Sequence, residues 1–288
     1  MNEYIIFADT GCDILPDKLE EWGVRCVDLT FRPEGEKRDY TQAEVPTKTF
    51  YDRMRAGTVF RTAAANNDTI KNALSPSLEE GRDVLYVCFG SGLSSTAGVA
   101  KLAAEELMDD FPGRRVIVID SLCASAGHGL LLWFAVDAKR RGLDLDECAA
   151  VVMEKLPNLC HWFTVDDLVY LKRGGRVSAA AAFFGGVLNI KPVLHVDDNG
   201  HLIPMMKVRG RNASIKALFK KFCETAVDPE HCTYFISNGD CLEDAEKLEA
   251  MIFAEFGNHA ALITDIGPVI GSHSGPGTLA LFFVGTQR

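Results

Sequence analysis

The chain has 288 residues, of which 47% are hydrophobic and 24% are charged, and its formal net charge is -10 at pH 7. This length suits two domains of ordinary size, and this hydrophobic content supports a substantial core. The acidic balance disfavours nucleic acid or an anionic membrane as the main partner.

The cysteines and the N-terminal sequence indicate the compartment. Nine cysteines are spaced irregularly from Cys12 to Cys241 and form no C-x-x-C pair, which predicts reduced thiols and no zinc site. The opening MNEYIIFADTG has neither a basic segment nor a long apolar stretch, so it does not resemble a signal peptide. The uncharged apolar run at residues 121–136 is short for a bilayer span. We therefore expect a cytoplasmic protein with no stable membrane insertion.

The first half of the chain alternates short apolar runs with helical patterns. Strands are expected at 4–8, 25–30, 83–89 and 114–120, and helices at 16–22, 47–56, 96–111 and 121–142, with another beginning near 68. Residues 60–66 show no strong periodicity and are expected to form a loop. Strands that alternate with helices imply a parallel sheet with right-handed crossovers. Residues 1–156 are therefore predicted to form an open α/β domain.

The pattern changes after Leu156-Pro157. Asn199-Gly200 is a strong hairpin signal between strands expected at 193–196 and 202–208. Further strands are expected at 232–237, 260–267 and 279–284, around helices at 213–226 and 243–255. Residues 157–288 are therefore predicted to form an α+β domain with a mixed sheet.

The stretch FGSGLSS follows the strand expected at 83–89 and precedes a helix. Small residues at such a junction expose backbone N–H groups at a helix N-terminus, which suits a phosphate or a carboxylate. Ser94 or Ser95 can equally be a helix cap, and the two interpretations are compatible. A dinucleotide fingerprint is disfavoured, because glycine would be required where Ser95 stands.

Two further polar residues and one basic cluster are candidates for a site. Thr62 is expected in a loop, where its hydroxyl can add a second donor to the same anion, or serve no ligand at all. His273 is expected in the Gly- and Pro-rich loop GSHSGPG before the last strand, and is either a structural or a working histidine. The basic cluster forms either a solvated face or a patch for an acidic partner or phosphate. Its members are Arg173, Arg176, Lys191, Lys207, Arg209 and Arg211.

The sequence also lacks the common catalytic motifs. It contains no G-x-S-x-G elbow, no G-x-x-x-x-G-K-[ST] phosphate loop and no H-E-x-x-H helix. No carboxylate pair stands out for acid–base work. An anion-binding turn without catalytic groups favours binding over catalysis.

Several segments together resemble the DegV family. The most specific is FTVDDLVYLKRGGRVSAAAAFFGGVLNIKPVL, and SGLSST, VIDSLCASAGHGLLL, KVRGR and IGPVIGSHSGPGTLALFFVG resemble it as well. The resemblance extends from ADTGCDIL near the N-terminus to the end of the chain. It therefore covers essentially the whole sequence.

This resemblance implies a two-domain, non-catalytic lipid-binding subunit of a bacterial fatty acid kinase. Such a subunit holds one long-chain fatty acid, needs no cofactor, and presents the carboxylate to a separate ATP-binding kinase subunit, which forms acyl phosphate for phospholipid synthesis. The implied carboxylate contacts are the Thr62 and Ser94 hydroxyls and the Ser95 backbone N–H. His273 would lie at the same mouth and assist there. Arg209 would lie on the surface offered to the kinase.

Two segments depart from the family pattern. Gly11-Cys12 stand where the family has a Ser-Thr or Ser-Ala pair after the first aspartate. Ala63-Ala64-Ala65 follow Thr62 where the family commonly has Ser-Gln-Pro. These departures bear on the shape of the second loop and on the preferred acyl chain.

The physical logic of such a site is simple. Burying the alkyl tail stabilises the complex by about 0.8 kcal/mol per methylene, whereas burying the carboxylate is costly without hydrogen bonds or dipoles. A helix N-terminus and two hydroxyls can compensate without any lysine or arginine. The small apolar stretch at 179–186 is either a wall for the tail or a close-packed helix. The alternatives to a lipid-presenting subunit are a free-standing α/β enzyme and a lipid-bound regulatory or scaffold protein.

Overall fold

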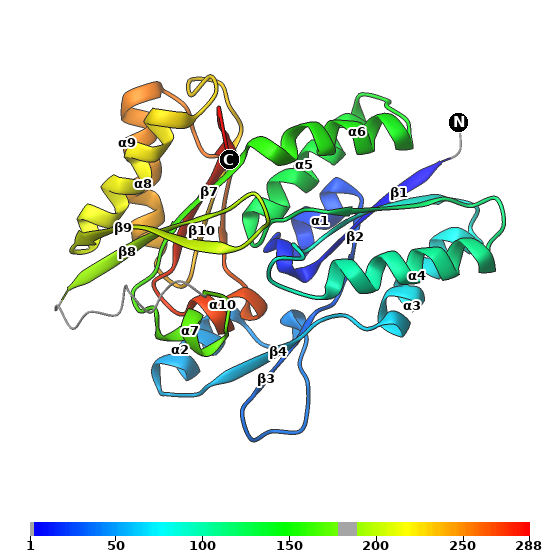
Figure 1. The fold of residues 1–288 in the computed structure, drawn as a ribbon, viewed down its shortest axis with the longest axis horizontal. Coiled ribbons are helices and arrows are strands. Elements are labelled where there is room, and N and C mark those ends of the chain that lie inside the picture. The colour runs from blue at the N-terminus through cyan, green and yellow to red at the C-terminus, as the bar shows by residue number, and fades with distance from the viewer. Residues whose placement is uncertain (1–2, 178–188) are drawn as a thin grey trace.

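The computed structural model of the chain describes residues 3–177 and 189–288, and they form two sheets with helices between and around them (Figure 1). The N-terminal sheet has the strand order β2-β1-β5-β6, with every neighbouring pair parallel. Its strands are β1 (Tyr4–Asp9), β2 (Val24–Val27), β5 (Asp83–Cys88) and β6 (Val116–Asp120). The predicted open parallel α/β domain is confirmed.

Helices cover both faces of this sheet. On one face lie α1 (Pro16–Trp22), α5 (Ala126–Arg140) and α6 (Leu145–Lys155), and on the other lie α3 (Asn67–Glu79) and α4 (Thr96–Asp110). The crossover helix from β1 to β2 and the one from β5 to β6 thus lie on opposite faces. The strand order therefore reverses between β1 and β5, which places a crevice at the carboxyl ends of these two strands.

The C-terminal sheet is larger and mixed, with the order β11-β10-β12-β7-β8-β9. Its strands are β7 (Leu159–Thr164), β8 (Ile190–Val196), β9 (Leu202–Arg209), β10 (Tyr234–Asn238), β11 (Leu262–Asp265) and β12 (Leu279–Val284). The helices α8 (Arg211–Thr225) and α9 (Leu242–Phe256) pack on one face. The predicted mixed sheet is confirmed, whereas the domain division at 156 and 157 stays a prediction.

The helix α5 lies between the two sheets and packs against β10 and β12 as well as β5 (Figure 1). Leu130, Leu131, Leu132 and Ala135 follow one another around it, and all four are fully buried. A helix that is apolar on every side is stable only inside a core. One continuous apolar cluster therefore joins both halves of the chain.

A small two-stranded sheet and three helices complete the fold. The strands β3 (Thr30–Pro33) and β4 (Phe60–Ala63) pair antiparallel, and α2 (Thr47–Arg55), α7 (Val169–Arg173) and α10 (Pro268–Ser274) pack near them. Short 3-10 turns η1 (Thr10–Cys12), η2 (Gln42–Glu44) and η3 (Leu156–Asn158) link the elements. None of the helices within the described ranges combines the length and the apolar character needed to cross a bilayer.

The predicted hairpin at Asn199-Gly200 is confirmed, and its tip touches the turn after β5. Gly200 has a φ of 81°, which favours glycine, and it joins the antiparallel strands β8 and β9. A Cβ at Gly92 would lie 2.6 Å from the backbone oxygens of Asn199 and Gly200. Only glycine fits at 92, so the two sheets meet there backbone to backbone.

Three sequence expectations are wrong in detail. The strand expected at 25–30 is divided between β2 and β3. The chain leaves the N-terminal sheet after β2, and the Leu29 N–H donates to Thr10 Oγ1 over 2.9 Å. The loop expected at 60–66 contains β4, which is too short to show periodicity and forms by pairing with β3. The helix expected from 121 begins at Ala126, after Ser125 with a φ of 55°.

Three helices, α6, α7 and α10, were not predicted from the sequence. The α6 helix begins with a capping box, in which the Asp144 side chain accepts from Glu147 N and the Glu147 side chain accepts from Asp144 N. This D-x-x-E signal stands in the sequence directly after Gly142 and was a sufficient indication of the helix.

Candidate functional site: a cavity and its polar mouth

A cavity of ≈ 230 Å³ lies at the carboxyl ends of the N-terminal strands, where they face the C-terminal sheet. Phe89 and Leu93 reach it from the segment after β5, Ser125 from the start of α5, and Ala280 and Phe282 from β12. The cavity therefore occupies the crevice that the strand order creates.

The wall of the cavity is mainly apolar. Leu29, Phe163, Val196, Leu202 and Val269 are among its lining residues. Among the described residues that line it, Arg176 alone carries a formal charge. Burial and the neighbouring Arg288 lower the pKa of the lining residue His161 well below its usual range, so this imidazole is neutral. An apolar ligand body is what such a wall accommodates.

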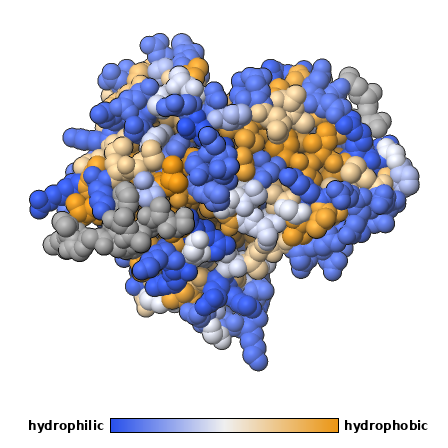
Figure 2. All heavy atoms as spheres, in the orientation of Figure 1, coloured by the Kyte–Doolittle hydropathy of each residue, from blue (hydrophilic) through white to orange (hydrophobic). Residues whose placement is uncertain are grey.

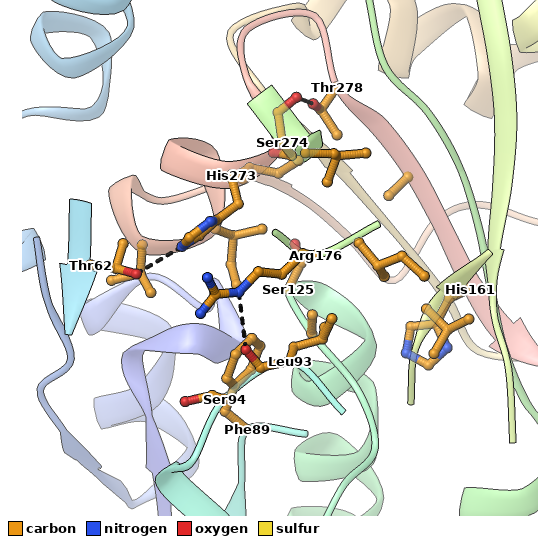
Figure 3. A pocket seen from close by; sticks show the side chains of 18 of the residues that line it. Thr62, Phe89, Leu93, Ser94, Ser125, His161, Arg176, His273, Ser274 and Thr278 are labelled. Atoms are coloured by element: carbon orange, nitrogen blue, oxygen red, sulfur yellow. Dashed lines mark hydrogen bonds between the residues drawn. The ribbon is translucent and has the colours of Figure 1, made fainter. Parts of the chain in front are cut away.

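Thr62 and His273 meet at one end of the cavity (Figure 3). A hydrogen bond of 2.7 Å joins Thr62 Oγ1 on β4 to His273 Nε2. His273 lies on the short helix α10, and not in the loop expected from the sequence. Gly275, which has a φ of 81°, ends this helix two residues after His273. A Cβ at Gly174 would lie 2.2 Å from His273 Nδ1, so glycine there leaves room for the ring.

His273 is a neutral imidazole. Burial lowers the pKa of His273 from its ordinary value to about 4, and the positive charge of Arg176 acts in the same direction. The Nδ1 atom is buried without a hydrogen-bond partner among the described residues. Near neutral pH the ring therefore contributes one N–H donor and no charge.

Ser94 and Ser95 also line the cavity, at the start of α4. Ser94 Oγ lies 2.9 Å from Thr96 Oγ1 and accepts from Thr96 N over 3.2 Å. Of the two serines expected as a helix cap, Ser94 is therefore the one whose side chain accepts a hydrogen bond from the first turn of α4. Its hydroxyl hydrogen is available to a ligand when Thr96 Oγ1 donates to Ser94. Ser95 is the N-cap residue and is exposed, and its side chain makes no capping bond.

Arg176 lies between these serines and the Thr62–His273 pair (Figure 3). Its Nε donates to Leu93 O over 3.2 Å, and Nη1 donates to Gly174 O. The anion site expected from the sequence contained no lysine or arginine, whereas the structure places Arg176 beside it. Nothing in the sequence separated Arg176 from the other basic residues of its cluster, because its position depends on a contact with a residue 83 positions earlier.

The rest of the basic cluster does not join the cavity. Lys191 Nζ lies 2.8 Å from Asp166 Oδ1, and Arg211 Nε lies 2.8 Å from Asp244 Oδ2, so both serve ion pairs. Arg209 is exposed at the end of β9, opposite Ile190, and lines no part of the cavity. The expected tail wall at 179–186 lies outside the described residues.

The departures from the family pattern have clear positions. Ala63 and Ala64 line the cavity and are exposed, while Ala65 is buried. A Cβ at Gly11 would lie 2.9 Å from both Asp9 Oδ1 and the Phe89 ring, so glycine fits here because the backbone is close to both. Two small residues in the cavity wall leave space where longer side chains would fill it.

A buried polar network behind the cavity was missed from the sequence. Asp13 Oδ2 accepts from Ser125 Oγ over 2.5 Å, and Asp13 Oδ1 accepts from Gly267 N over 2.9 Å. Ser125 Oγ also lies 2.9 Å from Ser237 Oγ on β10. Burial raises the pKa of Asp13 to about 8 despite these donors. The network joins the two halves, and its members are too far apart in the chain to be grouped from the sequence.

The described part of the chain contains no group of His, Cys, Asp and Glu residues able to hold a metal ion. The chemistry of the site therefore rests on hydroxyls, one neutral imidazole, one guanidinium and backbone N–H groups. Groups of these kinds are suited to binding and orienting an anion at the end of an apolar cavity.

Solved structures of the same fold carry lipid-related descriptions. A DegV family protein from Thermus thermophilus, described by its fatty acid binding, superposes with a TM-score of 0.89 at 28% identity, covering 99% of this chain and 100% of that one. A DegV lipid binding protein from Thermotoga maritima superposes with a TM-score of 0.86 at 27% identity, covering 99% of each chain.

The sequence comparisons identify the family. The family model described as "Uncharacterised protein, DegV family" matches residues 4–286. A DegV domain-containing protein of Clostridium perfringens is 38% identical over 289 residues, covering 100% of this chain and 99% of that protein. The chain belongs to the DegV family.

Proposed function

We propose that this chain is a cytoplasmic, non-catalytic subunit that binds a long-chain fatty acid and presents its carboxylate to a separate ATP-binding kinase subunit. The observation that carries the proposal is the cavity itself, which is apolar along its wall and ends at Thr62, Ser94 and His273. The similarity to a fatty-acid-binding DegV protein at 28% identity supports it.

The hydrogen bonds at the mouth give a consistent arrangement for the carboxylate. In the tautomer that carries the proton on Nε2, the neutral His273 donates to Thr62 Oγ1, and the Thr62 hydroxyl hydrogen then turns toward the ligand. The Ser94 hydroxyl and the Ser95 backbone N–H donate from the opposite side, at the N-terminus of α4. Arg176 supplies a nearby positive charge, which offsets the cost of removing the carboxylate from water.

In the reaction served by this arrangement, one carboxylate oxygen attacks the γ-phosphorus of ATP. The new bond joins that oxygen to phosphorus, the bond from phosphorus to the bridging oxygen breaks, and ADP leaves. The products are acyl phosphate and ADP. The kinase subunit supplies the nucleotide and the phosphoryl-transfer groups, while this chain holds the acceptor in place.

Identification of the co-purified ligand tests the proposal. Mass spectrometry of material released from the purified protein is expected to show a long-chain fatty acid, which a fatty acid kinase and ATP then convert to acyl phosphate. A bound nucleotide in place of lipid would instead support a free-standing enzyme. A fatty acid that no kinase phosphorylates would support a regulatory or scaffold protein.

Two variants separate binding from presentation. His273→Ala is expected to retain most of its lipid and to form acyl phosphate slowly, because the carboxylate is held but less well oriented. Arg209→Ala is expected to keep a normal lipid content and to couple poorly to the kinase, because Arg209 is exposed and is not part of the cavity lining. An unchanged rate across kinase concentrations would remove Arg209 from the docking surface.

A further inference from the structure

A second, polar hollow adjoins the lipid cavity, and we call it the arginine chamber. It has a volume of ≈ 590 Å³ and is built from the β3–β4 pair, the segment after α7 and helix α10. Thr62, Ala63, Arg176 and His273 line both the chamber and the cavity. The Thr62–His273 pair therefore belongs to the wall that the two hollows share.

The chamber is positively charged although the protein is acidic. Arg32, Arg61, Arg173 and Arg176 line it, against Glu34 and Asp39. Four positive and two negative charges leave an excess of two positive charges, in a chain whose net charge is -10. Within the described ranges, neither Arg173 nor Arg176 has a carboxylate in ion-pair contact. The surrounding surface over β3 and β4 is mainly hydrophilic (Figure 2).

Two of these arginines oppose each other across the β3–β4 pair. Arg32 is the direct register partner of Arg61, in a position where like charges are destabilising. Arg61 has a close carboxylate partner, Glu34 Oε1 at 2.6 Å, whereas the partner of Arg32, Asp39 Oδ1, lies 3.7 Å away. Such a pair is stabilised when an anion with several oxygens lies between the guanidinium groups, because their planar forks match phosphate geometry.

We propose that the arginine chamber is a binding site for a phosphoryl anion, placed directly beside the lipid carboxylate. This inference rests on the proposed fatty-acid binding and extends it. The anion has two chemical sources, the phosphate carried by a lipid product and the terminal phosphate of a donor polyphosphate. Both present a compact, multiply charged phosphate, and Arg61, Arg32 and Arg173 bind it while Thr62 and His273 hold the adjacent carboxylate.

The first experiment uses a lipid-borne phosphate. Purified, delipidated protein is titrated with hexadecanoate and, separately, with hexadecylphosphonate, and the dissociation constants are compared. In an Arg32→Gln/Arg61→Gln variant, phosphonate binding is expected to weaken about tenfold while hexadecanoate binding is kept. Arg115→Gln is the matched control, because Arg115 also forms a 2.6 Å exposed ion pair, with Asp146, and lies outside the chamber.

The second experiment uses a donor-type phosphate. Protein loaded with hexadecanoate is titrated with inorganic tripolyphosphate and followed by phosphorus NMR, in wild type and in Arg173→Gln. Arg173 belongs to α7 and not to the β3–β4 pair, so this variant still tests the chamber if the double variant does not fold.

The outcomes separate the possibilities. Arginine-dependent binding of the phosphonate alone assigns the chamber to a lipid-borne phosphate, and arginine-dependent binding of tripolyphosphate assigns it to the donor. Arginine-independent behaviour of both probes, with hexadecanoate still bound, overturns the chamber and leaves the proposed function standing. Failure to bind hexadecanoate in the wild type overturns both.

Discussion

The lipid cavity and the arginine chamber share part of one wall and differ in almost everything else. The cavity is lined mainly by aliphatic and aromatic side chains, together with hydroxyl groups, two histidines and a single arginine, whereas the chamber has four arginines and two carboxylates. Thr62 and His273 belong to both linings. Under the two proposals, the hollows meet different solvation requirements, because an alkyl tail needs an uncharged wall and a phosphate needs cations. Of the residues that line both hollows, Thr62, Ala63 and His273 are uncharged, and Arg176 brings one positive charge to the shared wall.

Filling the cavity is expected to have the largest effect of the changes considered, and the quantity that changes is the amount of bound fatty acid. Ala280→Trp places a large ring where Ala280 lines the cavity, and we expect retained fatty acid to fall below about a tenth of the wild-type level, at a stability cost of about 1–3 kcal/mol. Lipid released per mole of protein measures the effect. Leu281→Trp overpacks the opposite face of the same strand and is expected to keep its lipid. Normal lipid content in Ala280→Trp would place the tail elsewhere.

Removing the hydroxyl at the shared wall comes next. Thr62→Val keeps the shape and suits a strand, but it deletes the donor to the carboxylate and the partner of His273. We expect fatty-acid affinity to fall about 10- to 100-fold, the range for charge-assisted hydrogen bonds. Ser94→Ala is expected to act in the same direction. Ser95→Ala is the control, since Ser95 contributes its backbone N–H, and equal losses in all three variants would argue against a specific carboxylate site.

Displacing the imidazole without removing it gives a smaller effect. Gly174→Ala adds a methyl group 2.2 Å from His273 Nδ1, so the ring has to shift and its bond to Thr62 weakens. We expect acyl phosphate formation to slow about 2- to 10-fold, with most of the lipid retained. Gly98→Ala is the matched control, because a Cβ there meets nothing within 4 Å. An identical rate in both variants would show that His273 geometry is irrelevant to transfer.

The smallest expected effect concerns stability and pH. Because the pKa of His273 is lowered to about 4, the unfolded chain binds the proton more readily than the folded one. This residue's contribution to the unfolding free energy is therefore complete above pH of about 6.5 and is lost as the pH falls toward 4. Chemical denaturation at several pH values, in wild type and His273→Gln, isolates it. A variant with the same slope as wild type in this window would contradict a neutral, buried His273.

Other titrating groups also change the unfolding free energy with pH, so the denaturation of wild type and of His273→Gln has to be measured in parallel. The pKa of Asp13 is raised to about 8, so its contribution has the opposite sign and is lost as the pH rises from about 4 toward 8. Only the difference between wild type and His273→Gln removes this background.

The sequence predicted the alternating elements of the first half, the hairpin at Asn199-Gly200 and a serine cap at 94 or 95, because each depends on local periodicity or on one or two residues. It did not predict β4, whose four residues form a strand only through pairing with β3. Nor did it place His273 on a helix, since α10 has seven residues between Gly267 and Gly275 and contains Pro and Gly itself.

The candidate site likewise contains residues that the sequence predicted and residues that it did not. Thr62, Ser94, Ser95 and His273 all line one cavity, as the family resemblance implied, although their roles toward a ligand stay predictions. Arg176 and the Asp13 network depend on contacts between distant segments, which no local pattern reports. The arginine chamber is likewise invisible in the sequence, because Arg32 and Arg61 become neighbours only when β3 pairs with β4.

The contact between Gly92 and the tip of the β8–β9 hairpin has a consequence for the width of the cavity. Leu93 and Ser94 on one side, and Val196 and Leu202 on the other, line the cavity right beside that contact. Any side chain at position 92 would clash with the backbone of the hairpin tip and push the two linings apart. The distance between the two linings of the cavity therefore depends on residue 92 having no side chain.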